Sequence, residues 1–307
     1  MNANKLSFQK FRSLSIVQFS TDETNSFDYI SLSNALKNKF AEVTEVSESG
    51  DVNSLSLINN SEYFIFMSDG DILSGAKQNR VLNTSVFVAP KSKLTIPVSC
   101  IEQGRWRYSK KNFSDSNYTA PSYMRSGKAK DVKKSLDKNK LFEASQSEVW
   151  DNVRDYEKLY CLNSSTSNLS DIFEDKMIDI ENFIKSFIAD SGANGLAIFV
   201  NNKLLNLEIF NRTDIYNEYF SKLLKSATFD TINLKEEENT LTEAEAFYKT
   251  NEFMDSLPNM KFDIHNGVGV GVEKRFESNE ITGFELEYET KMIHCVALSL
   301  KKDKFDP

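Results

Sequence analysis

The chain has 307 residues, 40% of them hydrophobic and 12% aromatic, which is enough to bury one large core or two smaller ones. Its net charge of −8 argues against nonspecific binding of nucleic acid by the whole surface, so we expect no bulk nucleic-acid partner. No stretch approaches the ~20 apolar residues that span a bilayer, so we expect no membrane contact. The three cysteines lie far apart in the sequence, so we expect a reduced, cytoplasmic protein.

The first 120 residues are typical of β-structure, because short apolar runs are bounded there by Ser, Asn, Asp and Gly. The expected elements are strands at residues 13–20, 41–46, 52–58 and 63–67, and a short helix at 28–40. Two further strands, 81–89 and 94–101, would form a hairpin joined by residues 90–93. This series predicts an N-terminal antiparallel β-sandwich-like region over residues 1–120.

The pattern changes after residue 120. Residues 108–123 are polar and aromatic and favour an irregular loop, a type of segment that is often functional. The helices expected after it cover residues 127–138, 145–159, 177–190, 214–225 and 242–257. A hairpin at 194–210 and strands at 261–276, 281–288 and 291–300 complete the list. The sequence therefore predicts an α+β fold, with a mixed region over 121–307 that packs on the first and closes with strands.

Positive charge is concentrated in one part of the chain. Residues 77–134 carry 13 Lys and Arg and three acids, a local charge of +10, whereas the remaining residues sum to −18. The asymmetry favours a small anionic ligand at a local site, although lysines spread over a solvated surface would give the same count.

Two dense polar clusters, at residues 76–80 and 100–106, bracket the expected hairpin. The candidate ligand-binding residues are Lys77, Gln78, Asn79, Arg80, Gln103, Arg105 and Trp106. Arginine pairs with anionic groups through two parallel hydrogen bonds. Aromatic residues interleave with these cations, and a flat ring beside a cation suits a nucleotide, whose base stacks while its phosphates pair. Ordinary anchoring of a loop is the alternative for the aromatic residues.

Cys100 and Glu102 are the candidate catalytic residues. Alternate residues of a strand share a face, so both would follow Ile96 and Val98 on the side that faces the core. Cys100 could be a nucleophile with a thiolate stabilised by the nearby cations, or a small side chain that fills the core. Glu102 could be a general base or an acid that orients the ligand, or it could form a structural ion pair with Arg105.

His294, the glycine-rich run and the cysteines give weaker indications of a functional site. His294 lies in an apolar strand, which is more typical of a core histidine than of a catalyst. The glycine-rich run at 267–271 lacks a following helix, so it favours a bend in a strand over a dinucleotide fingerprint. No cluster of His and Cys has zinc spacing, so we name no metal site and leave the cofactor unknown.

The motifs GAKQNR (75–80) and IPVSCIEQGRW (96–106) resemble those of the ARPP-1 family, the ARG and rhodanese-phosphatase-superfamily-associated protein domain. Weaker similarities continue at Arg125, at residues 145–150, and at Arg275 and His294. The family is named for its association with ADP-ribosylglycohydrolases and similar proteins. The resemblance therefore implies nucleotide or ADP-ribose metabolism in a bacterial conflict or repair system.

Two functional hypotheses follow. The first is an enzyme that acts on a phosphorylated, nucleotide-like substrate, such as ADP-ribose or a compound related to NAD, by an unknown reaction. The second is a noncatalytic module that senses an anionic ligand or docks a protein, whose identity the sequence does not indicate. The presence of Cys100 and Glu102 within the cationic cluster slightly favours the enzyme.

Overall fold

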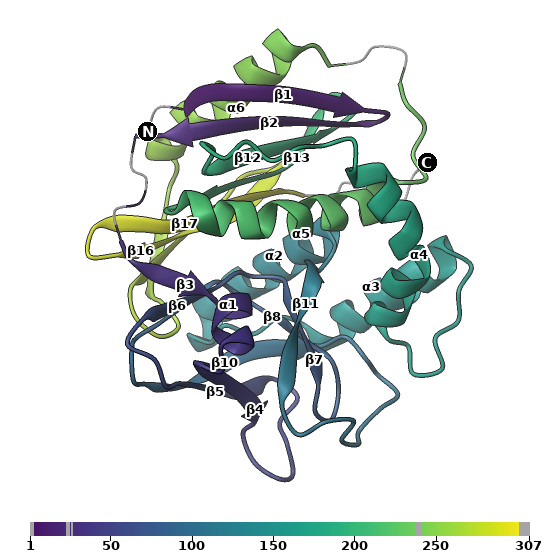
Figure 1. The fold of residues 1–307 in the computed structure, drawn as a ribbon, viewed down its shortest axis with the longest axis vertical. Coiled ribbons are helices and arrows are strands. Elements are labelled where there is room, and N and C mark those ends of the chain that lie inside the picture. Colours follow the sequence, from purple (N-terminus) through teal and green to yellow (C-terminus); the bar gives the residue numbers. More distant parts are fainter. Residues whose placement is uncertain (1–2, 23–24, 26, 238–240, 301–307) are drawn as a thin grey trace.

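The computed structural model describes residues 3–22, 25, 27–237 and 241–300, and it has the predicted α+β architecture (Figure 1). Its described strands form three sheets of eight, six and three strands. The helices are α1 (Leu32–Lys37), α2 (Ser122–Asn139), α3 (Gln146–Leu159), α4 (Leu169–Ile184), α5 (Thr213–Thr231) and α6 (Glu243–Ser256), followed by a 3-10 turn at Leu257–Asn259. None of these helices is long and apolar enough to cross a membrane.

The eight-stranded antiparallel sheet combines both ends of the chain. In spatial order its strands are β1 (Ala3–Phe11), β2 (Leu14–Thr21), β12 (Gly195–Val200), β13 (Lys203–Phe210), β17 (Lys291–Ser299), β16 (Ile281–Tyr288), β15 (Val272–Glu277) and β14 (Asp263–Asn266). Central strands such as β12 are buried along their whole length because helices cover both faces of the sheet, α6 on one and α5 on the other (Figure 1). The boundary at residue 120 between two regions stays a prediction, but the large sheet contains strands from both sides of it.

The two smaller sheets carry the motifs. The six-stranded sheet has the order β11 (Phe113–Thr119), β7 (Asp71–Gly75), β8 (Arg80–Leu82), β10 (Lys93–Cys100), β5 (Ser54–Asn59) and β4 (Ala41–Glu45). The three-stranded sheet contains β3 (Tyr29–Ser31), β6 (Phe64–Met67) and β9 (Val86–Val88). Helix α5 is buried over most of its length because it lies between the large sheet and β11 (Figure 1).

The predicted hairpin is wrong in its pairing. The segment 81–89 breaks into β8 and β9, because the chain leaves the six-stranded sheet at Asn83 and β9 then pairs with β6 in the three-stranded sheet. Strand β10 pairs with β8 through Val98, Ser99 and Cys100, and with β5 through its first half. Arg80, at the end of the first motif, is still next to Cys100 in the second motif, because β8 pairs with β10.

Three other predicted elements also differ. The expected loop at 108–123 contains β11, whose polar residues pair with β7 at the edge of the sheet. The expected helix at 28–40 begins with β3, which leaves only α1 helical. Helix α4 begins at Leu169, earlier than expected, where Asn168 caps it by accepting a hydrogen bond from the Ser170 N–H. Strand β1 has too little apolar alternation to be predicted.

The glycine run at 267–271 is the connection between β14 and β15 rather than a bend within one strand. Gly269 and Gly271 have φ values of +87° and +99°, which glycine adopts without a steric penalty. The run also touches the three-stranded sheet, because Val270 donates a backbone hydrogen bond to the Phe87 carbonyl. It therefore joins the large sheet to β9.

Candidate functional site

The two predicted motifs meet at the end of the β8–β10 pair, where Arg80 and Cys100 are directly opposite each other. Helix α3 holds this end in place. Its first residue, Gln146, accepts a hydrogen bond from the Cys100 N–H at 2.8 Å and donates one to the Cys100 carbonyl at 2.7 Å. Ser145 caps the helix by accepting from the Glu148 N–H. The cap thus supports the strand end that carries the motif.

Glu102 is buried and its carboxylate is fully engaged. Arg105 donates to both carboxylate oxygens, from Nε to Oε1 and from a terminal nitrogen to Oε2, at 2.7 Å each. Oε1 also accepts from Thr166 Oγ1 at 3.2 Å, and Oε2 accepts from the Asn79 N–H at 3.0 Å. The carboxylate therefore accepts four hydrogen bonds, two of them from a bidentate arginine.

Arg105 also fixes the first motif. Its guanidinium donates to the carbonyl of Ala76 at 2.7 Å and to that of Gly75 at 3.3 Å. Ala76 has a φ of +36°, an unfavourable conformation for a residue with a Cβ atom. The hydrogen bonds from Arg105 help to hold this turn, so the arginine links the two motifs through both an ion pair and the backbone.

Arg80 is fully buried but poorly paired. Its guanidinium donates to Gln78 Oε1 at 3.1 Å and approaches the Asp51 carbonyl at 3.5 Å, while the nearest Glu45 oxygen is 4.0 Å away. Among the described residues, its Nε has no hydrogen-bond partner, and neither has Oε2 of Glu45. Burial lowers the pKa of Arg80, against the opposing effect of Cys100 and Glu45. A buried guanidinium with spare donors is costly unless something pairs with it.

Lys77 lies between two aromatic rings. Its ammonium is 5.4 Å from the ring centre of Trp106 and 5.3 Å from that of Tyr108, and it donates to the carbonyls of Glu48 and Ser49. The guanidinium of Arg80 is 5.7 Å from the Trp106 ring. Both motifs thus contribute to one aromatic and cationic arrangement.

Cys100 is buried, and burial raises the pKa of its thiol. The thiol donates to Gln78 Oε1 at 3.0 Å and lies 3.1 Å from the Glu102 carbonyl. A raised pKa keeps the sulfur protonated at neutral pH, which disfavours nucleophilic attack in this arrangement. The role of Cys100 as a nucleophile, like that of Glu102 as a base, stays a prediction.

Of the remaining predicted residues, Gln78 and Asn79 lie in the cluster, whereas the Gln103 side chain is exposed and accepts a hydrogen bond from Arg154 at 3.2 Å. Asn79 donates to Asn168 Oδ1 and Ser170 Oγ at the start of α4, and Gln78 contacts the Gln103 carbonyl at 3.4 Å. Sequence reasoning missed five of the partners that complete the cluster, which are Glu45, Asp51, Thr166, Asn168 and Ser170. They come from separate segments of ordinary polar composition, whereas Gln146 lies in the segment 145–150 that weakly resembles the family. No group of three or more potential metal ligands occurs among the described residues.

A family model describes the same motifs. The model named ARPP-1, for ARG and Rhodanese-Phosphatase-superfamily-associated Protein domain, matches residues 4–298. The chain belongs to the ARPP-1 family. Neither a curated protein nor a solved structure matches it. The match covers both motifs and all three sheets, so the family model describes the whole fold and not an isolated segment.

The weaker ARPP-1 similarities, Arg125 and His294, meet in a second polar network. Arg125 donates to both oxygens of Asp69, at 2.7 and 3.1 Å, and to Glu208 Oε1 at 2.7 Å. His294 Nε2 lies 3.3 Å from Glu208 Oε2, and its Nδ1 lies 2.9 Å from Ser85 Oγ. Burial raises the pKa of Glu208, but Arg125 and His294 lower it to about 2.

This second network is fully buried in the centre of the molecule, and His294 has partners on both ring nitrogens. A serine, a histidine and a glutamate in series resemble a hydrolytic triad, but Ser85 has no exposed surface. Arg275 is buried beside it and pairs with Glu273 and Thr84. The arrangement is that of a structural network that joins α2 to the large sheet.

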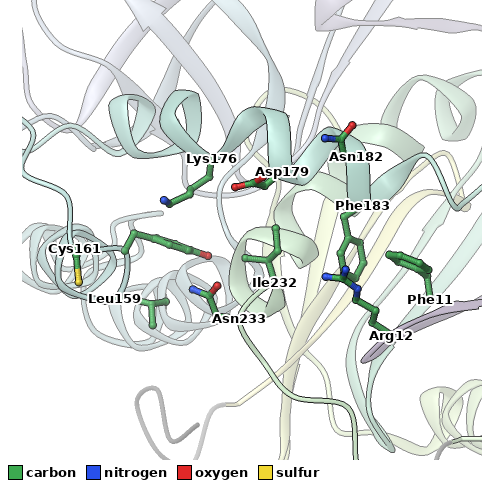
Figure 2. A pocket seen from close by; sticks show the side chains of 11 residues that line it. Phe11, Arg12, Leu159, Cys161, Lys176, Asp179, Asn182, Phe183, Ile232 and Asn233 are labelled. Atoms are coloured by element: carbon green, nitrogen blue, oxygen red, sulfur yellow. The ribbon is translucent and has the colours of Figure 1, made fainter.

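A cavity of about 450 Å³ lies away from the motifs, between the β1–β2 turn and the helices α3, α4 and α5 (Figure 2). Lys176, Asp179 and Phe183 line it from one face of α4, and Arg12 and Phe11 close it from the turn (Figure 2). None of the predicted site residues lines this cavity. The candidate site is thus a polar cluster with an aromatic rim and is separate from this cavity.

Proposed function

We propose that the protein binds an anionic, nucleotide-like ligand at the motif cluster. The excess of positive charge in the cluster carries this proposal. Three cations, Lys77, Arg80 and Arg105, are gathered with two carboxylates, Glu45 and Glu102, and all five are buried or nearly so. An uncompensated charge is costly away from water, so a phosphate or carboxylate that supplies one negative charge would stabilise the cluster.

The aromatic rim favours a nucleotide over a simple anion. The side chain of Trp106 is 47% exposed and stands over both Lys77 and Arg80. A base stacked on this indole would place its phosphates near the cations beneath it. ADP-ribose fits this chemistry, and the ARG association in the family name supports nucleotide-related ligands.

The present geometry favours a binding module over an enzyme. The carboxylate of Glu102 accepts four hydrogen bonds, which leaves no free lone pair directed at a substrate. The thiol of Cys100 is buried and its pKa is raised. A general base and a nucleophile both need an accessible, reactive group.

The enzyme remains the second candidate because Cys100 and Glu102 are adjacent in the cluster, with the Glu102 N–H 3.4 Å from the sulfur. Glu102→Gln and Cys100→Ser test it. If either variant keeps affinity for a nucleotide but loses its turnover, the enzyme hypothesis gains. If the wild-type protein turns over no nucleotide while it binds one, the module hypothesis stands.

Thermal unfolding with ADP-ribose, NAD, ATP or inorganic phosphate tests the proposal directly. A ligand at ~100 times its dissociation constant stabilises the folded state by roughly 2.7 kcal/mol. Arg80→Met should abolish the shift, whereas Lys91→Gln, a change at an exposed lysine paired with Glu62, should leave it intact. The absence of a shift with all four compounds would contradict the proposal.

A further inference from the structure

We propose that residues 105–111, here called the basic aromatic loop, bind single-stranded nucleic acid. Its sequence is Arg-Trp-Arg-Tyr-Ser-Lys-Lys, so four of its seven residues are Arg or Lys, including the Arg105 that pairs with Glu102. The inference deepens the proposed function and rests on it in one respect, because both place a nucleotide at Trp106. It adds that the ligand is a strand and not a mononucleotide.

The two aromatic side chains of the loop are presented to solvent. Trp106 is 47% exposed and Tyr108 is 50% exposed. They are two positions apart, and the ammonium of Lys77 contacts both rings. Exposed rings next to a cation are the stacking platform that proteins use for unpaired bases.

Hydrogen bonds to the carbonyl of Ala76 anchor the loop to the first motif. Arg105 donates to the Ala76 carbonyl at 2.7 Å and to the Arg107 carbonyl at 3.0 Å, and the Ser109 N–H donates to Ala76 at 2.9 Å. Gly50 lies under the loop, where an added Cβ atom would come 3.3 Å from the Trp106 ring. Such anchoring reduces the entropy lost when a ligand binds the rings.

The positive charge of the loop and the cluster together exceeds what the two phosphates of ADP-ribose can neutralise. Arg107, Lys110 and Lys111 are exposed, and their side chains have no hydrogen bond or ion pair with the part of the chain that the structure describes. With the single excess charge of the buried cluster, four positive charges face the ligand. ADP-ribose has two phosphates, so a strand with several phosphates matches the surface better.

A single strand is favoured over a duplex because stacking on Trp106 and Tyr108 requires bases that are not already stacked and paired. The rest of the chain carries −18 outside residues 77–134, so contact beyond the loop is repelled. Nucleic acid therefore binds at the loop and not over the rest of the surface. The loop binds a short strand, and its affinity depends strongly on salt.

Intrinsic fluorescence gives a direct test, since the chain has two tryptophans, Trp106 and Trp150. Titration with a 15-nucleotide oligo-dT or oligo-rU at low salt should quench the emission of the exposed Trp106. Trp106→Phe should remove the quenching, although Trp150 remains. Tyr108→Ala should weaken binding about tenfold or more, whereas Tyr248→Ala, at a residue that is 67% exposed on α6, should not.

Salt dependence tests the cations. Each phosphate contact to a single strand contributes about −0.7 to the slope of log K against log salt. The triple variant R107Q/K110Q/K111Q should reduce the magnitude of this slope by about 2. The variant should keep its thermal shift with ADP-ribose, because Arg80 is unchanged.

The outcomes separate this inference from the proposed function. If ADP-ribose shifts the thermal midpoint but neither oligonucleotide quenches Trp106, the inference fails and the proposed function stands. If the oligonucleotides bind but no mononucleotide does, and Arg80→Met keeps full affinity for the strand, the proposed function fails alone. Equal competition by poly-glutamate would overturn the inference in favour of an acidic protein partner, and tighter binding of a duplex would overturn it as well.

Discussion

Two fully buried arginines illustrate how differently the same side chain is accommodated in this protein. Arg125 makes three hydrogen bonds to Asp69 and Glu208, and these two carboxylates raise its pKa against the effect of burial. Arg80 has an unpartnered Nε among the described residues, and burial lowers its pKa. The first is a paired structural charge, whereas the second has donors to spare for a ligand.

Replacement of each arginine by methionine should separate these roles. Arg125→Met leaves two buried carboxylates without their partner, so we expect a loss of about 3–5 kcal/mol in the free energy of unfolding. Arg80→Met should cost less than half as much, because Lys77 and Arg105 then balance Glu45 and Glu102. Urea unfolding at neutral pH measures both. Equal losses for the two variants would contradict the assignment of Arg80 as a ligand-binding residue.

Lys128 makes stability depend on pH. Its ammonium is buried and donates to the Leu82 carbonyl at 2.5 Å, and burial lowers its pKa from 10.5 to about 7. Between these two values the unfolded chain binds a proton that the folded protein does not, so the free energy of unfolding rises with pH. Below pH 7 both states are protonated and the full cost of burying the charge remains.

Lys128→Met should remove this rise. In the wild-type protein the contribution amounts to about 1.4 kcal/mol per pH unit between pH 7 and 10.5. Urea unfolding at pH 7, 8 and 9 measures the free energy of unfolding of both proteins. The difference between the variant and the wild type should shrink by roughly 2–3 kcal/mol from pH 7 to pH 9. The difference between the two curves isolates the lysine from other titrating groups. Parallel curves would show that Lys128 keeps an ordinary pKa.

At the scale of elements, the glycine connection between β14 and β15 fixes the large sheet against β9. A Cβ atom on Gly269 would lie 2.2 Å from the Phe87 carbonyl oxygen, and its φ of +87° is itself unfavourable for alanine. Gly127, within α2, has no atom within 4 Å of the corresponding position. The two glycines are thus a matched pair, one required by its contacts and one not.

Gly269→Ala should therefore destabilise the protein by more than 1 kcal/mol through strain and the lost approach to β9. Gly127→Ala should stabilise it by about 0.5–1 kcal/mol, because alanine has the higher helix propensity. Thermal unfolding of both variants measures these shifts. A neutral Gly269→Ala would mean that the connection moves without cost.

Local patterns predicted elements well where polar and apolar residues alternate or a cap is present. Residues 41–46 and the start of α3 at Gln146 were predicted nearly to their observed ends. The hairpin at 81–101 was not, because β9 leaves β8 for a different sheet, and no local signal identifies a remote partner such as β6. Strand β11 was missed since an edge strand can be polar on both faces.

At the scale of the molecule, the large sheet makes the two ends of the chain interdependent. Strand β2 is almost wholly buried and pairs with β12 on one side and β1 on the other. Phe19 packs against Gly195, where a Cβ atom would be 2.2 Å from the phenyl ring. Residues 1–120 alone would leave this strand without its central neighbour.

A fragment of residues 1–120 should therefore fail to fold on its own. We expect it to lack near-ultraviolet circular dichroism and a cooperative urea transition, because exposed β2 loses the apolar burial that the sheet provides. The full-length chain is the control, and should unfold with a single transition. A cooperative transition in the isolated fragment would establish an independent N-terminal domain.

The sequence by itself determined the α+β class and the family, because these depend on local periodicity and on short motifs. The tertiary structure alone decided how those residues are paired. It placed four donors around Glu102, left the Nε of Arg80 without a partner among the described residues, and brought the Trp106 ring next to the Arg80 guanidinium. The reason is that hydrogen bonding and burial depend on segments such as β4 and α4, which are remote in sequence and carry no local signal of the contact.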